Sequence, residues 1–102
     1  MKNFKVKVYP EAIAEIKDAA SWYNQQQPGQ GKKFQKTVIK QINGLGKDPY
    51  TYAIRYNHIR CMIVKKFPYM VHFYIHDELN TLEVLAVINT SRNPEIWVDK
   101  TM

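Results

Sequence analysis

Three polar side chains interrupt two otherwise apolar segments of this sequence. Arg60 alternates with apolar residues just before a Phe-Pro-Tyr corner, and His72 and Tyr74 do so just after it. Because residues two apart in a strand share a face, pairing of the two segments would bring these three side chains together. Cleaving RNA through its 2′-hydroxyl needs a cation that binds the phosphate and a group that exchanges a proton. A guanidinium can serve as the cation, and an imidazole or a phenol can exchange the proton.

The alternation before the corner predicts which side of the sheet carries the cations. Ile59, Cys61 and Ile63 share one face, and we expect this apolar face to pack against the main core. Arg60 and Lys66 share the other face. The sequence therefore predicts a polar patch on the side of the sheet away from the core.

Two simpler interpretations of the polar side chains stay open. Arg60 can pair with Glu83 across strands, since oppositely charged residues are common cross-strand neighbours. His72 can pack under Tyr74 without any chemical role. Under these interpretations the patch only stabilises the sheet.

The elements that position these residues begin with a short strand and two helices. Residues 4–9 alternate as a half-buried strand does, and Pro10 ends it and starts a helix that reaches about Gln26. Turn-forming residues over 25–31 separate it from a second helix. The second helix has an apolar stripe of Phe34, Val38, Ile42 and Leu45.

The rest of the chain predicts a sheet. Strands are expected over residues 52–57, 59–66, 69–76 and 81–89, and an irregular tail or short helix over 90–102. The strand over 81–89 is apolar on both faces, which is typical of an interior strand. The fold class is therefore α+β: an N-terminal strand, then an antiparallel helical hairpin packed on one face of a twisted antiparallel β-sheet.

Composition and charge limit the classes of protein. The 102 residues fit one domain, expected to span 1–102, and 15 Lys and Arg against 9 Asp and Glu give a net charge of +6, which favours polyanionic or acidic partners. Cys61 is the only cysteine, so we expect a cytoplasmic protein without an intrachain disulfide. No membrane span and no cofactor are expected, because the sequence has neither about 18 consecutive apolar residues nor a glycine-rich phosphate loop. No metal site is expected, because His58 and His76 lack a second ligand at suitable spacing.

An ordered set of motifs resembles the RelE/ParE toxin superfamily of type II toxin-antitoxin systems, nearer its ParE-like branch. It is carried by Trp22-Tyr23, residues 27–31, Phe34, Asp48-Pro49, Arg60, residues 66–69, residues 84–87, residues 91–94 and Trp97. The resemblance implies a small basic toxin that forms a hetero-oligomer with a cognate antitoxin. The antitoxin's disordered, usually acidic C-terminal segment would fold across the toxin.

The resemblance leaves the cellular target open. RelE-like members cleave mRNA at the ribosome, using Lys and Arg residues along the sheet and a tyrosine near the C-terminus. Arg60 and Arg92 match two such arginines, but no tyrosine follows Arg92, and the long hairpin with Trp22 and Tyr23 is more ParE-like. We therefore expect a toxin that inhibits DNA gyrase by contact rather than by turnover.

Two alternatives accompany this expectation. The first is a RelE-like endoribonuclease that acts on ribosome-bound mRNA with Arg60, His72 and Arg92 as catalytic residues. The second is a degenerate homologue that only binds its antitoxin or nucleic acid.

Two surfaces are candidates for partner binding. The helix lysines Lys33, Lys36 and Lys40, with Lys66 and Tyr74 of the sheet, would meet a nucleic acid or an acidic antitoxin, unless the lysines only form a solvated helix face. The second surface is aromatic, with Trp22, Tyr23 and Phe34. It would anchor an antitoxin helix, unless these rings close the core between helices and sheet.

Overall fold

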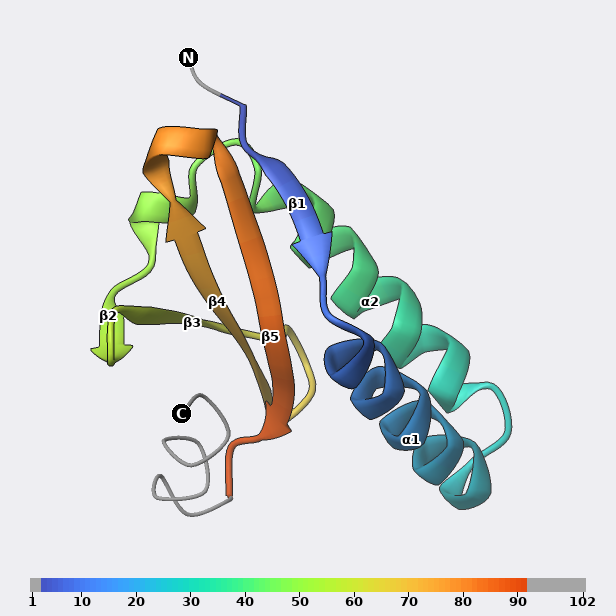
Figure 1. Cartoon of the computed structure of the whole chain (residues 1–102). Helices are drawn as coiled ribbons and strands as arrows, with labels where there is room; N and C mark the ends of the chain where they lie inside the picture. The colour runs from blue at the N-terminus through green and yellow to red at the C-terminus, as the bar shows by residue number, and fades with distance from the viewer. Residues whose placement is uncertain (1–2, 92–102) are drawn as a thin grey trace.

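The computed structural model describes residues 3–91, whose path is shown in Figure 1. In chain order the elements are β1 (Lys5–Val8), α1 (Pro10–Gln26), α2 (Gln30–Gly44), the 3-10 helix η1 (Pro49–Thr51), β2 (Ile54–Tyr56), β3 (Ile59–Ile63), β4 (Tyr69–His76), the 3-10 helix η2 (Asp77–Leu79) and β5 (Thr81–Asn89). Each helix and strand predicted within residues 3–89 is present. The strands expected over 4–9, 52–57 and 59–66 are shorter than predicted.

The five strands form one sheet of order β1-β5-β4-β3-β2. β1 runs parallel to β5, and the other neighbours are antiparallel. Both helices lie on one side of this sheet (Figure 1). The predicted α+β class is confirmed, and β5 has a neighbour on each side, as its two apolar faces predicted.

The helical hairpin begins and turns at residues suited to those places. Pro10 occupies the first turn of α1, where its missing N–H would have no partner within the helix. The backbone N–H of Gln27 closes the last turn by donating to the Tyr23 carbonyl. Gly29 then adopts φ +89°, a left-handed conformation that costs glycine little, and α2 starts at the next residue.

The main core lies between the hairpin and the sheet face that it covers. Phe34, Val38 and Ile42 are buried on one side of α2, as the apolar stripe predicted. The sheet contributes Met62, Val71, Phe73, Leu82, Val84 and Val87 to the same cluster, and Val64 joins it just after β3. No helix among residues 3–91 has the length and apolar character needed to cross a membrane.

A glutamine of α2 fixes the corner between β3 and β4. Nε2 of Gln41 donates to the Ile63 carbonyl at 3.1 Å, and Oε1 accepts the backbone N–H of Lys65 at 2.8 Å. Lys66 follows with φ +67°. The amide therefore satisfies two backbone groups that the ladder loses where the strand ends.

The two faces of β3 are the reverse of those predicted. Met62 pairs with Val71 and Arg60 with Phe73, so Arg60 lies on the helix side of the sheet. Cys61 pairs with His72 on the opposite side, called the far face from here on. The prediction was wrong because β3 is buried on both faces, so its alternation carries no information on which face meets the helices.

Candidate functional site

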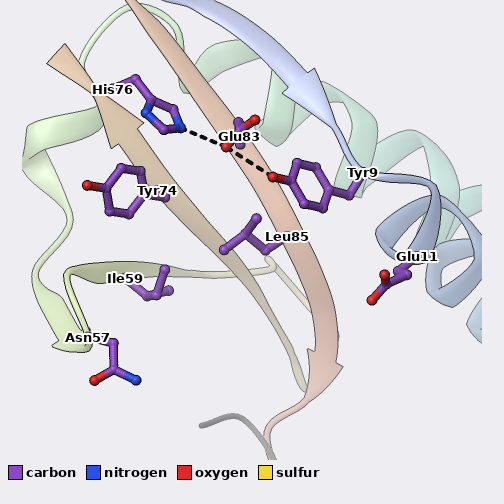
Figure 2. A pocket seen from close by; sticks show the side chains of 8 residues that line it. All are labelled: Tyr9, Glu11, Asn57, Ile59, Tyr74, His76, Glu83 and Leu85. Atoms are coloured by element: carbon purple, nitrogen blue, oxygen red, sulfur yellow. Dashed lines mark hydrogen bonds and ion pairs between the residues drawn. The ribbon is translucent and has the colours of Figure 1, made fainter. Parts of the chain in front are cut away.

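A hollow of about 400 Å³ opens on the far face of the sheet. Tyr74 of β4 and Tyr9, between β1 and α1, stand on either side of Leu85 (Figure 2). Leu85 and the buried Ile59 give it apolar surface. The polar residues that line it are Glu11, Asn57, His76 and Glu83.

The carboxylate of Glu83 is the centre of the polar side of this hollow. The Tyr9 hydroxyl donates to Oε1 at 3.2 Å, and Nε2 of His76 lies 2.7 Å from the same oxygen (Figure 2). Partial burial and the carboxylate together raise the pKa of Tyr9. The ring of Tyr74 packs on His76 with 4.7 Å between centroids. The carboxylate is therefore held in place by Tyr9, which follows β1, and by His76 of β4.

The predicted grouping of Arg60 with His72 is wrong. Arg60 lies on the helix side, whereas His72 lies on the far face and is fully buried. The alternative pairing of Arg60 with Glu83 is also absent, because Glu83 is opposite Tyr74 on the far face and bonds with Tyr9 and His76.

His72 lies inside a small buried group rather than at an accessible surface. Its Nδ1 is 2.8 Å from the hydroxyl of Tyr56 and 3.4 Å from Sγ of Cys61. Burial raises the pKa of Tyr56 well above its ordinary value, so the phenol keeps its proton. Of the predicted patch, Tyr74 alone lines the hollow. Catalytic roles for Arg60 and His72 stay predictions.

Arg60 anchors the segment that precedes β2. Its Nη1 donates to the Tyr52 carbonyl at 2.6 Å, and its guanidinium carbon lies 5.1 Å from the centroid of the Tyr50 ring. The Tyr50 hydroxyl in turn donates to Asp77 at 2.5 Å, and this bond raises the pKa of Tyr50. These contacts tie η1 to β3 and to η2.

Replacing Arg60 by alanine should lower the free energy of unfolding by about 1.5–3 kcal/mol, the range for a hydrogen bond to a charged group. Urea unfolding measures this loss. Arg55→Ala is the matched control, because Arg55 is exposed on the neighbouring β2 and its loss should change stability by about 0.5 kcal/mol or less. Equal effects of the two substitutions would contradict an anchoring role for Arg60.

The single cysteine should be almost unreactive in the folded protein. Burial raises the pKa of the Cys61 thiol to about 11. At pH 8 only about one molecule in a thousand would then carry the thiolate that reacts with iodoacetamide. Mass spectrometry should find Cys61 unmodified in the native protein and rapidly alkylated in guanidinium. Fast alkylation of the native protein would show that the thiol is accessible.

The predicted lysine surface is exposed along α2. Lys33, Lys36 and Lys40 are all exposed, and the last two line a shallow hollow around Ile39, which is 50% exposed. Lys66 is exposed at the corner after β3. The structure thus places these four cations at the surface, and their partner stays a prediction.

The aromatic surface is divided between core and exterior. Phe34 is fully buried and Tyr23 packs against the core, as the alternative interpretation expected. Trp22 is 52% exposed beside a groove between α1 and the end of β5. Only Trp22 of the three presents much of its ring to a partner.

Some predicted residues cannot be placed, and some residues of the hollow were not predicted. Arg92 and the rest of the predicted tail lie outside the described residues. Within residues 3–91, no three His, Cys, Asp or Glu side chains are grouped so that they could hold a metal ion. The sequence reasoning missed the roles of Tyr9, Glu11 and Glu83. The two-residue spacing of Tyr74 and His76 was the available signal that both share the far face.

Comparison with known proteins identifies the family of this chain. The sequence matches the family model described as the ParE toxin of the type II toxin-antitoxin system parDE over residues 6–94. The structure is similar to a chain of the chromosomal ParDE toxin-antitoxin system from P. aeruginosa, with TM-score 0.76, 15% identity, and 86% of this chain and 97% of that chain covered. It is also similar to a mutant of the E. coli toxin RelE in the free state, with TM-score 0.64, 13% identity, and coverages of 99% and 96%. No curated protein matches the sequence.

The two kinds of comparison support different statements. At such low identity the solved structures show that the fold is shared, and no more. The family model covers most of the chain, and the family it describes implies an antitoxin partner. The chain therefore belongs to the ParE toxin family of type II toxin-antitoxin systems.

Proposed function

We propose that this ParE-family toxin inhibits DNA gyrase by protein contact in the cytoplasm and is neutralised by a cognate antitoxin. The observation that supports contact over turnover is the placement of Arg60 and His72 on opposite faces of the sheet. Cleavage of RNA needs a cation and a proton-transfer group at one phosphate. Among residues 3–91, the arginine and the histidine of the predicted site do not meet this requirement.

The decisive experiment measures gyrase activity with purified toxin. A relaxed plasmid is incubated with gyrase, ATP and increasing toxin, and we expect loss of supercoiled product or accumulation of cleaved DNA. Relaxation of the supercoiled form of this plasmid by topoisomerase I is the control, because a chain of net charge +6 also binds DNA without specificity. Unaffected supercoiling at excess toxin would remove gyrase as the target.

A second assay separates the alternatives. Ribosome-bound mRNA should stay intact in the presence of the toxin, and specific cleavage would instead establish a RelE-like endoribonuclease. If expression without an antitoxin leaves growth unchanged, the chain is a homologue that binds without poisoning.

A further inference from the structure

The hollow on the far face concentrates negative charge on a basic protein. Glu11 and Glu83 both line it, whereas the whole chain carries +6. No lysine or arginine is among the described residues that line it. Lys7 stands opposite Glu83 in the pairing of β1 with β5 but does not line the hollow. A phosphate is therefore disfavoured here, and a cation is favoured.

The side chains that line the hollow favour one kind of cation. Tyr9 and Tyr74 offer aromatic rings on either side of Leu85, and Ile59 extends the apolar surface (Figure 2). An arginine side chain combines an apolar stem with a planar charged head, so the stem would lie over the apolar surface. The guanidinium would stack on a tyrosine and pair with a carboxylate, which a compact ammonium does less well.

The carboxylate of Glu83 is ready to accept such a head group. Both of its hydrogen bonds, from Tyr9 and with His76, end at Oε1. Among the described residues, no group forms a hydrogen bond with the second oxygen, Oε2. Since a carboxylate accepts about four hydrogen bonds, Glu83 has unused capacity for a ligand. The bonds at Oε1 also reduce the ordering needed on binding.

We infer that this hollow, formed by Tyr9, Glu11, Tyr74, Glu83 and Leu85, binds an arginine side chain of a partner protein. The volume of about 400 Å³ lies within the range of about 300–1,000 Å³ found for ligand sites. The proposed binding site is acidic, whereas the lysine surface along α2 is basic. Binding there does not depend on which cellular target the toxin inhibits.

The test is an NMR titration of the ¹⁵N-labelled full chain with N-acetyl-arginine-methylamide. Saturable shifts are expected at the backbone amides of Tyr74, Glu83 and Leu85, with a dissociation constant on the order of millimolar for a single side chain. The citrulline derivative has nearly the same shape without the charge, and should bind at least about fivefold more weakly. Equal binding of the two compounds would overturn the inference.

Two variants and a matched control locate the binding. Glu83→Gln should weaken arginine binding about fivefold or more, and Glu11→Gln about twofold. The second variant keeps the test valid if the first disturbs the fold, because Glu11 is exposed. Asp18→Asn removes the same charge from an exposed site of α1 outside the hollow and should leave binding unchanged. An equal loss in Asp18→Asn would show only general electrostatic attraction and contradict a site.

The same spectra decide between a protein and a nucleic-acid partner. A uridine dinucleotide carries aromatic bases and a phosphate, and the two carboxylates should keep it from perturbing these amides. Stronger shifts with the dinucleotide than with the arginine derivative would overturn the inference in favour of a nucleic-acid site.

Discussion

Replacing Gly31 by alanine is expected to destabilise the protein by about 2–4 kcal/mol, which lowers the melting temperature by about 10–25 °C for a domain of this size. A Cβ at this position would lie 2.1 Å from the Ala20 carbonyl oxygen and 2.7 Å from Cγ of Asn24. The backbone N–H of Gly31 also donates to the Asn24 side chain at 2.8 Å. Because backbone oxygen cannot rotate away, the start of α2 must move off α1.

Gly44→Ala is the matched control for this substitution. Gly44 ends α2, its φ is negative, and a Cβ there meets nothing within 4 Å. Alanine should therefore stabilise the protein by about 0.5–1 kcal/mol, through the lower entropy of the unfolded chain. Guanidinium unfolding of both variants measures the change in the free energy of unfolding, which should have opposite signs in the two proteins. A Gly31→Ala protein as stable as the wild type would mean that the helices do not cross this closely.

The helical half of the fold could be predicted from the sequence because its signals are local. Pro10 can start a helix but not continue a strand, and the apolar stripe of α2 has the helical period. The predicted end near Gln26 agrees with that of α1, whereas α2 starts at Gln30, inside the break expected over residues 25–31. Local backbone chemistry was enough for these elements.

The assignment of sheet faces could not be predicted in the same way. β3 has Met62 buried on one side and Ile59 and Cys61 buried on the other. An alternating pattern identifies a core face only where the other face is polar. The charge of Arg60 suggested a solvent face, but its guanidinium is held at the Tyr52 carbonyl.

The far-face hollow depends on contacts that are distant in the chain. Tyr9 and Glu83 are brought together by the parallel pairing of β1 with β5, and no local pattern specifies this pairing. Tyr74 and His76 could be placed on one face by their spacing, but not beside Tyr9. The chemistry of the hollow therefore follows from strand order rather than from a motif.

Replacing Phe34 by alanine is expected to cost about 3–5 kcal/mol, the range for removing a fully buried phenylalanine. Phe34 is 0% exposed, and its ring centroid lies 5.3 Å from that of Tyr23, 5.1 Å from that of Phe67 and 5.0 Å from that of Tyr69. These contacts join both helices to β4 and to the corner before it. Loss of the ring leaves a cavity where these elements meet, and thermal unfolding measures its effect.

Trp22→Ala is the comparison that separates packing from partner binding. The indole is larger than a phenyl ring, but it is 52% exposed and contacts Tyr23 at one edge, so its loss should cost only about 1 kcal/mol. Equal destabilisation by the two substitutions would contradict the division between a buried and an exposed aromatic residue. A stable Trp22→Ala toxin that is no longer neutralised by its antitoxin would identify the indole as a binding anchor, because a folding defect could not explain the loss.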